Sequence, residues 1–352
     1  PPMSQPVHIV AVVALTPVGL TAESSAAAVR ARVSRIKEHP FMVDATGQKL
    51  RCALCESVDP TMLGAERLSL LTRRSLHAMG AALHLRTPLR SPVPLLLALP
   101  ESRAGFSRSH AESVLRSLSA TAVPGIMQLS VERAGDGHAG VFCGMEQGVR
   151  AVSEGRTELC LVGGVDSYFD ADTLDWLDSE RRIARDGIRS GFSPGEGACL
   201  LALADDVTRR QLGLPSLGVI RSVTTAMEKR SIDSDEGLLG EAVTEVVNRA
   251  TSTLPNGMAV IDSVYCDING ERHRTDEWGF TLLRTGALFR DGTDYITGVS
   301  EWGDLGAATA ALNCMLATQA WQRGYAMGPS TLVWGGSWNG LRGAMLLEQG
   351  RG

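Results

Sequence analysis

The sequence predicts an α/β protein in which helices cover parallel β-sheets. Short apolar runs of strand length alternate with longer segments whose apolar residues recur at helical spacing. The two halves of the chain also resemble each other, because a strand that ends in Gly-Gly and a polar turn occurs both at 159–167 and at 331–340. This repetition indicates a duplicated unit.

The first half supplies strands and helices in turn. Residues 8–15 are a continuous apolar run that Thr16-Pro17 ends, and residues 65–85 repeat Leu and Ala at helical spacing. Ser109 is the expected cap of a helix that runs to residue 119. The same criteria predict helices at 22–36 and 138–152, and strands at 93–99, 158–164 and 198–204.

The second half repeats this alternation after a short linker at 204–218. Predicted strands lie at 217–226, 261–270, 294–300, 331–340 and 342–349, and predicted helices at 237–254, 276–288 and 305–324. The last helix is rich in small residues, which suits close burial. We therefore expect an N-terminal half over 1–205 and a C-terminal half over 206–352, packed as one compact unit.

Composition excludes several classes of protein. The 352 residues are 44% apolar and 21% charged, with a formal net charge of −5, and the scattered Lys and Arg residues favour neither nucleic acid nor an anionic membrane as a partner. No apolar run reaches the roughly 18 residues of a membrane span, and no signal peptide is expected. Seven cysteines in mostly apolar contexts suggest a reducing cytoplasm. Cys52 and Cys55 lack a second ligand pair, so we expect neither a metal nor a cofactor.

A glycine-spaced turn at 135–152 feeds an amphipathic helix. Turns of this kind often present a nucleophile at the start of the helix, and the residue presented here is His138. Cys143 lies more than one turn further in, where a cysteine usually acts as a small apolar side chain. A register shifted by five residues would make Cys143 the nucleophile but would break the spacing to Gly155.

Four segments together resemble the β-ketoacyl synthase branch of the thiolase superfamily, and the resemblance covers nearly the whole chain. They are the opening strand, turn and helix at 7–36, the Gly-Gly strand at 154–167, the R-D-G…G-E-G-A segment at 181–205, and the closing strands at 333–348. The resemblance implies a thiolase-like five-layer αβαβα sandwich of two similar halves. It also implies an obligate homodimer or heterodimer.

Condensing enzymes of that family use a cysteine at a helix N-terminus, where the helix dipole favours a thiolate, together with two histidines. By resemblance, the cysteine position falls on His138, which lies seventeen residues before Gly155 and twenty-five before Gly163. The first histidine is replaced by Asn269, followed by Gly270. The second is replaced by Asp304, and Val299 stands where the family has a lysine. The Cys-His-His site is therefore expected to be degenerate.

Other family positions persist. Gly195, Glu196 and Gly197 retain the G-E-G motif, which indicates a retained fold core rather than activity. Gly335 and Gly336 could form a backbone oxyanion loop, or serve only the turn between two strands. His273 could face the pocket, although its polar surroundings are more typical of a solvated turn; Asp276 and Glu277 suit a helix N-terminus there.

Condensation is not expected from this set of residues. An acyl-imidazole on His138 would hydrolyse before a slow second substrate arrived, and an ionised Asp304 would repel a malonyl carboxylate. Hydrolysis stays open, with His138 as base, Asp304 as its orienting carboxylate and Asn269 as oxyanion donor. The alternative is that the three residues only fill a vacated pocket.

Two functions follow as hypotheses. The first is a ketosynthase-like pseudoenzyme that binds proteins as a scaffold, or as an accessory or adaptor subunit. Its partner would be a synthase subunit or a secreted effector, since the chain also resembles thiolase-like accessory proteins of type VI secretion effector clusters. The alternative is an acyltransferase or thioesterase-like enzyme that acts on acyl-CoA or acyl-carrier protein through His138. A weaker third hypothesis is a ligand-binding sensor.

Overall fold

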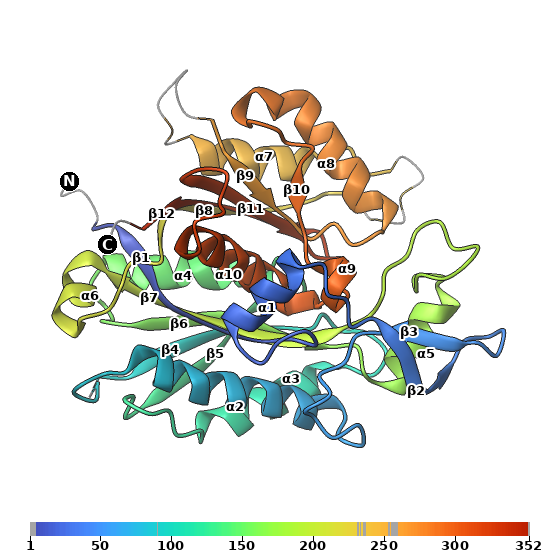
Figure 1. Cartoon of the computed structure of the whole chain (residues 1–352), viewed down its shortest axis with the longest axis horizontal. Coiled ribbons are helices and arrows are strands. Elements are labelled where there is room, and N and C mark those ends of the chain that lie inside the picture. The colour runs from blue at the N-terminus through green and yellow to red at the C-terminus, as the bar shows by residue number, and fades with distance from the viewer. Residues whose placement is uncertain are drawn as a thin grey trace.

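The computed structural model describes residues 5–89, 91–230, 232, 234, 237–252, 254 and 260–350. Two β-sheets and three layers of helices alternate (Figure 1). The first sheet has the strand order β5-β4-β6-β7-β1. Its strands are β1 (Val7–Leu15), β4 (Val93–Leu99), β5 (Leu129–Asp136), β6 (Cys160–Ser167) and β7 (Glu196–Asp205).

The second sheet has the matching order β8-β12-β11-β9-β10. Its strands are β8 (Gly218–Met227), β9 (Ser263–Tyr265), β10 (Tyr295–Ile296), β11 (Ser330–Gly336) and β12 (Leu341–Gln349). Strands β1 and β8 also pair over three residues, so the ten strands are hydrogen-bonded as one continuous sheet whose two five-stranded parts form the two sheet layers. The sheets are mixed rather than parallel as expected: β4, β5 and β6 run parallel, while β7 pairs antiparallel with both β6 and β1.

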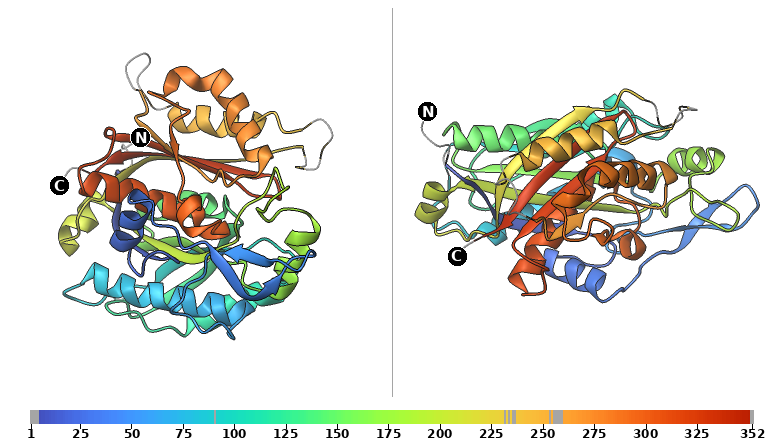
Figure 2. Two further views of the ribbon diagram at one scale, coloured as in Figure 1. Left: turned by 45° about the vertical axis from the view of Figure 1, so that its right-hand side comes forward. Right: turned by 90° about the horizontal axis from the view of Figure 1, so that it is seen from above.

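Helices fill the spaces between and outside the sheets, and the left view of Figure 2 shows the same layering. The middle layer holds α4 (Gly140–Ser153) and α10 (Thr309–Gln322) with α1 (Ala22–Arg30) beside them. Every residue of α10 from Ala310 to Trp321 is buried, as expected of a helix that is covered all round. The predicted five-layer αβαβα arrangement is therefore confirmed.

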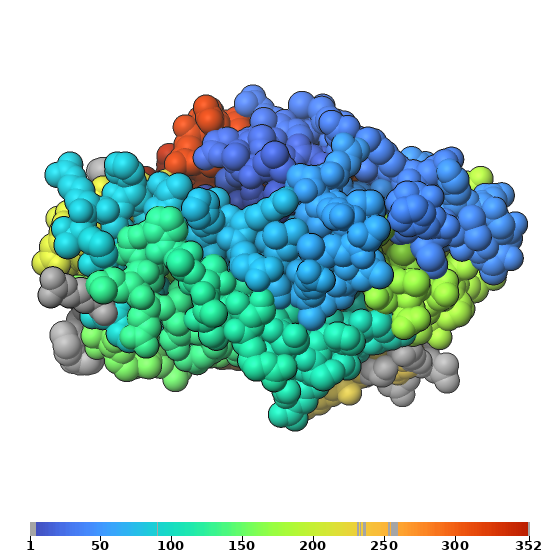
Figure 3. Space-filling model, turned by 90° about the horizontal axis from the view of Figure 1, so that it is seen from below, coloured from blue at the N-terminus to red at the C-terminus, as the bar shows by residue number. Residues whose placement is uncertain are grey.

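The outer layers each cover one sheet. Helices α2 (Gly64–Leu83) and α3 (Arg108–Ser119) cover the first sheet, and Figure 3 shows them spread over the lower face of the molecule. Helices α7 (Glu241–Thr251) and α8 (Arg272–Thr285) cover the second. Three short helices complete the chain: α5 (Ala171–Ser179), α6 (Asp206–Leu212) and α9 (Val299–Trp302). The division at 205/206 lies between β7 and α6 and stays a prediction.

Several predicted boundaries were wrong. The helix predicted at 22–36 ends at Arg30, because Arg32 adopts a left-handed φ of 56°, and residues 37–52 form a hairpin of β2 (Lys37–Val43) and β3 (Lys49–Cys52). The strand predicted at 294–300 consists of β10 followed by α9. The residue before α3 is Ser107, whose backbone N–H donates to Nδ1 of His110, so Ser109 lies inside the helix.

The remaining differences concern strand and helix starts. The helix predicted at 237–254 begins at Glu241, since Gly240 has a φ of 64°. The helix predicted at 276–288 begins four residues earlier, at Arg272. The strand predicted over 261–270 shortens to β9, which leaves 266–270 as the turn that carries Asn269. Strand β5 and helices α5 and α6 were not predicted.

Substitution by alanine is expected to have opposite effects on stability at two helical glycines. Gly279 lies on the exposed side of α8, and a Cβ there would meet nothing within 4 Å. Gly279→Ala is expected to stabilise the protein by about 0.5–1 kcal/mol, because alanine loses less backbone entropy in a helix. Gly144 in α4 is the matched control, because a Cβ there would lie 2.9 Å from Ala134 and from Val162. Gly144→Ala is expected to destabilise by about 1–3 kcal/mol. Urea unfolding distinguishes the two, and equal effects would contradict this account.

Candidate functional site

The turn before α4 is built from glycines that nothing larger could replace. Gly137 has a φ of 65°, and a Cβ there would lie 2.3 Å from the Glu101 carboxylate. Gly135 and Gly140 face each other so closely that a Cβ on Gly135 would lie 2.9 Å from the Gly140 Cα. His138 is held between them, directly before α4, and is 2% exposed.

His138, Asn269 and Asp304 lie in direct contact, although they come from three distant segments. Nε2 of His138 lies 2.8 and 2.9 Å from the two carboxylate oxygens of Asp304. The side-chain amide of Asn269 donates to the same carboxylate. Asp304 also accepts the Gly306 N–H at 2.7 Å and the Tyr168 hydroxyl at 3.3 Å. The three substituted positions therefore form one buried polar cluster.

Close backbone approaches place these side chains. Gly270, which follows Asn269, has a φ of 108°, and a Cβ there would lie 2.4 Å from the Gly191 carbonyl oxygen. On the other side, Gly195 N–H donates to the Asp304 carbonyl at 2.9 Å. A Cβ on Gly195 would lie 2.4 Å from the Trp302 carbonyl oxygen. The G-E-G segment thus holds the backbone of Asp304.

Arg274, which the sequence did not single out, completes the cluster. It is 2% exposed and bonds to the carboxylates of Asp267 and Glu271 and to the Gly336 carbonyl. Its Nη2 lies 3.4 Å from Nδ1 of His138. A guanidinium can only donate, so Nδ1 must be the acceptor nitrogen. The proton on Nε2 of His138 is therefore assigned to the hydrogen bond with Asp304.

The charges and hydrogen bonds of the cluster keep the carboxyl groups of Asp304 and Glu271 ionised. Burial alone would raise the pKa of Asp304, but His138, Arg274 and Asn269 outweigh burial and hold it well below its usual range. Burial likewise opposes ionisation of Glu271, and Arg274 and Arg182 lower the pKa of that carboxyl to about 2. Burial and the neighbouring Asp304 raise the pKa of the Tyr168 hydroxyl, which stays a neutral donor.

Three candidate oxyanion donors, the Gly336 N–H, the Ala139 N–H and the Asn269 amide, are engaged within the protein. Gly336 N–H donates to Asp267 at 2.7 Å, and Gly335 lies within β11, opposite Gly343 of β12. Ala139 N–H, next to His138, donates to the Ser337 hydroxyl at 2.9 Å. The Asn269 amide is divided between Asp304 and Glu271. A substrate oxygen would have to displace one of these bonds.

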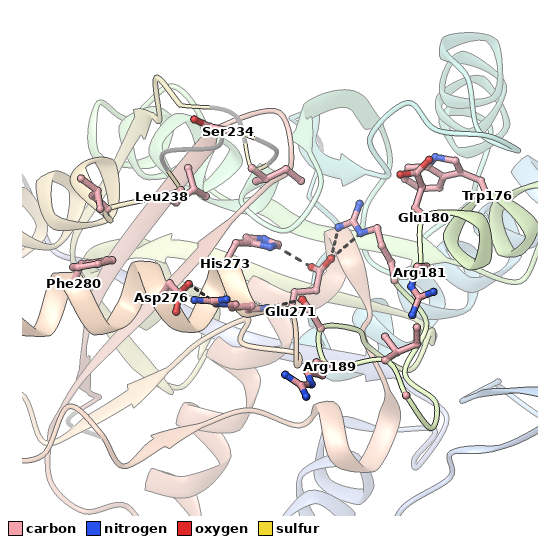
Figure 4. A pocket seen from close by; sticks show the side chains of 18 residues that line it. Trp176, Glu180, Arg181, Arg189, Ser234, Leu238, Glu271, His273, Asp276 and Phe280 are labelled. Carbon is pink, nitrogen blue, oxygen red and sulfur yellow. Dashed lines mark hydrogen bonds and ion pairs between the residues drawn. The ribbon is translucent and has the colours of Figure 1, made fainter.

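Aromatic rings close the cluster from outside. The Trp338 ring lies 6.2 Å from His138 and 5.7 Å from Trp176, measured between ring centroids. The Arg182 guanidinium stacks on Trp338 at 4.0 Å and pairs with Glu271. None of His138, Asn269 and Asp304 lines the groove of about 1190 Å³ that lies outside these rings (Figure 4).

Glu196 of the G-E-G motif is a fully buried anchor. Arg67 of α2 binds it bidentately at 2.6 and 2.7 Å, and it also accepts the Cys55 N–H and the Ser167 hydroxyl. Gly197, beside it, leaves room for the Leu15 carbonyl, which would lie 2.8 Å from a Cβ. The motif therefore ties β7 to α2 and to the segment that contains Cys55.

The remaining candidates lie away from the His138 cluster. Cys143 is half-buried inside α4, and burial with Glu146 nearby raises the pKa of its thiol. Val299 begins α9 as a half-buried apolar residue. Glu277 is not at a helix N-terminus but is buried mid-helix, where it pairs with Arg342 at 2.9 Å. Asp276 pairs with Arg272 along α8.

His273 is mostly buried rather than solvated. We therefore expect this residue to make the stability of the fold fall in acid. Burial and the nearby Arg274 lower its pKa from 6.5 to about 3. The unfolded chain therefore takes up a proton that the folded chain does not, so stability from this residue is complete above pH 6.5 and is lost as the pH falls toward 3. His273→Gln lacks this titration, so at pH 4 the variant is expected to keep on the order of 2–3 kcal/mol of stability that the unaltered protein loses.

Urea titrations at neutral and acidic pH measure that difference. His77→Gln, at an exposed position of α2, serves as the control. Parallel pH dependence in the His273→Gln variant and the unaltered protein would contradict the assignment.

Within the described ranges, no three His, Cys, Asp or Glu side chains converge as metal ligands do. No helix in those ranges is long and apolar enough to cross a bilayer.

The sequence matches no protein-family model and no curated protein. Solved structures do match. The ishigamide ketosynthase/chain length factor superposes with a TM-score of 0.79 at 12% identity, over 98% of this chain and 99% of that chain. The ketosynthase from module 6 of the Bacillus subtilis 168 bacillaene synthase gives 0.77 at 12% identity, over 99% of this chain and 72% of that chain.

A third similar structure is the AntDE:AntF complex of a type II PKS acyl-carrier protein with its ketosynthase. It gives a TM-score of 0.78 at 10% identity, over 99% of this chain and the whole of that one. At such low identity the likeness concerns architecture alone. This chain has the thiolase-like fold of the ketosynthases over nearly its whole length.

Proposed function

We propose that this chain is a ketosynthase-like pseudoenzyme that serves as a protein-binding scaffold, as an accessory or adaptor subunit. One observation carries the proposal: both ring nitrogens of His138 are engaged, Nε2 by Asp304 and Nδ1 by Arg274. A general base needs a free lone pair, and a nucleophile needs a path to substrate. His138 has neither, since Arg274 faces the lone pair and its ring is 2% exposed.

The competing proposal is a hydrolase that uses the same residues. The 2.8 Å contact between His138 and Asp304 favours it, because a base oriented by a carboxylate is the usual arrangement. Two features oppose it. The carboxylate holds the hydrogen-bearing Nε2 and so leaves Nδ1 as the only basic atom, and Asn269 has no free N–H for an oxyanion.

The proposed partner rests on similarity and on the edge of the first sheet. The ishigamide protein is a ketosynthase/chain length factor, and the AntDE:AntF structure holds a ketosynthase with its carrier protein. In this chain, β5 is an edge strand, and no described strand pairs with its outer side. We infer a homodimer or heterodimer, with a synthase subunit or a type VI secretion effector as the protein served.

Thioester turnover tests the proposal. The protein is incubated with malonyl-CoA and with acetyl-CoA, and free CoA, CO₂ and acylated peptides are measured by thiol titration and mass spectrometry. We expect CoA release at the buffer rate and no acyl adduct on His138, because its lone pair faces Arg274. His138→Ala is the matched variant. CoA release that this substitution abolishes would establish the hydrolase and end the scaffold proposal.

A further inference from the structure

A small pocket lies between the start of β2, residues 52–60 and Arg67 of α2. Its volume is about 270 Å³, just below the roughly 300–1,000 Å³ of sites that hold drug-sized ligands. Its lining residues fall within 35–67, a stretch that the structure describes without a gap, and none of them belongs to the His138 cluster. The rim is exposed and the floor is buried, so the pocket has room for one small molecule.

The inner walls of the pocket are apolar. Val58 is buried and Leu54 half-buried, and the ring of Pro40 lines the same space nearer the surface. The thiols of Cys52 and Cys55 complete the walls, and burial raises the pKa of both, so both stay neutral. Sulfur atoms make favourable contacts with aromatic rings. These walls therefore suit a compact apolar group such as a phenyl ring.

The guanidinium of Arg67, which lines the buried floor, keeps one N–H group without an acceptor. Its Nε and Nη2 each donate to Glu196, and its Nη1 donates to the carbonyls of Asp59 and Met62. These bonds use four of the five N–H groups of an arginine, and the second N–H of Nη2 has no acceptor among the described residues. A buried donor without an acceptor costs free energy, so the floor favours a ligand that supplies an oxygen.

The rim carries more positive than negative charge. Arg35 and Lys37 lie there with Glu56, and Lys37 pairs with Glu56. Lys37 and Arg35 both lower the pKa of Glu56, but no carboxylate among the described residues forms an ion pair with Arg35. Since the buried Arg67–Glu196 pair is neutral overall, Arg35 leaves the pocket with one positive charge in excess. Such an excess favours an anionic ligand.

The charges around the rim leave this excess in place. Glu38, the other acid of the lining, pairs with Lys49 at 3.5 Å. Asp59 lies outside the lining, and Arg74, which donates to the Ser57 carbonyl at 3.2 Å, offsets its charge. The charge of Arg35 is therefore the one that a ligand can neutralise.

We propose that this pocket binds a small monocarboxylate with a compact apolar body. One carboxylate oxygen would accept the free N–H of Arg67, and the excess charge of Arg35 would offset the carboxylate. The apolar body would lie against Leu54 and Val58, out of contact with water. The inference goes beyond the scaffold function and does not depend on it.

Ligand-observed NMR with phenylacetate tests the proposal, because saturation transfer to the ring protons reports binding to the intact chain. We expect saturable binding with a Kd of about 1 mM, which is ordinary for a ligand of this size. The affinity should fall as the ionic strength rises. Phenethylamine carries an ammonium on the same ring and is expected not to bind. Acetate, which lacks the ring, is expected to bind at least about tenfold more weakly.

Substitutions at the rim are expected to change the affinity in opposite directions. Arg35→Gln/Lys37→Gln removes two exposed cations and should weaken phenylacetate binding about tenfold. Glu56→Gln removes the exposed carboxylate that competes with the ligand and should strengthen binding about threefold. Arg86→Gln/Arg116→Gln removes two exposed arginines outside the lining and is expected to bind as the unaltered protein does.

Equal affinity for phenylacetate and phenethylamine would overturn the proposal, as would equal binding by the rim and control variants. Weaker binding by Glu56→Gln would also contradict it, because a purely structural role of the rim predicts a loss from both substitutions. Thioester turnover that His138→Ala abolishes would instead end the scaffold function and leave the pocket result standing.

Discussion

Replacing Arg274 by methionine is expected to lower the free energy of unfolding by about 3–5 kcal/mol. The guanidinium is buried and pairs with the carboxylates of Asp267 and Glu271, while its Nη2 faces His138. It also lowers the pKa of Asp304. Methionine would leave three buried carboxylates without their shared cation, and each must then be protonated or hydrated at a cost.

Urea unfolding measures the loss, and the neighbouring arginine on the same helix is the control. Arg272 is 82% exposed and pairs with Asp276 one turn along α8. Arg272→Met is expected to cost at most about 0.5 kcal/mol, because exposed pairs at this spacing contribute little. If the two substitutions cost the same, Arg274 is not the cation on which the cluster depends.

Sequence patterns located the parts of this fold that are long and regular. The apolar run predicted at 8–15 is β1, and the run at 93–99 coincides with β4. Both are buried strands, in which hydrophobicity along the chain directly reflects position in the core. The two-residue strand β10 and the three-residue strand β9 offer no such pattern, so their predicted ranges were too long.

The sequence indicated which residues occupy the positions of the His138 cluster, but it did not indicate which of their atoms form hydrogen bonds. The spacing from Gly155 and Gly163 indicated His138, and the structure brings it together with Asn269 and Asp304. Spacing could not show which groups occupy a ring nitrogen. That depends on Arg274, which lies in a polar run that was expected to be solvated.

Burial of a charge is decided by partners that the tertiary structure brings to it. Arg274 and Arg272 stand two residues apart in one helix, yet one is buried and the other exposed. The difference arises because Asp267, in the turn after β9, and the Gly336 carbonyl, at the end of β11, meet Arg274. No local signal distinguishes the two arginines, since the periodicity of a helix start is too short to define a face.

In the N-terminal half, the Arg67–Glu196 pair is expected to show the largest coupling free energy between two side chains in a double-mutant cycle. Arg67 is 1% and Glu196 0% exposed, and two hydrogen bonds join them. Arg67→Met is expected to destabilise by about 3–5 kcal/mol, because it leaves a buried carboxylate unpaired. Glu196→Gln keeps an oxygen acceptor for the Cys55 N–H but leaves the arginine charge uncompensated.

The double variant Arg67→Met/Glu196→Gln is expected to cost at least about 2 kcal/mol less than the sum of the single variants. It removes both charges together, so neither is left buried alone. Recovery should be incomplete, because Arg67 also donates to the carbonyls of Asp59 and Met62. Arg74→Met, at an exposed position of the same helix, is the control and should cost about 0.5 kcal/mol or less. Strictly additive costs would mean that the retained G-E-G motif does not hold β7 through this ion pair, and that Glu196 acts only through its bonds to Cys55 and Ser167.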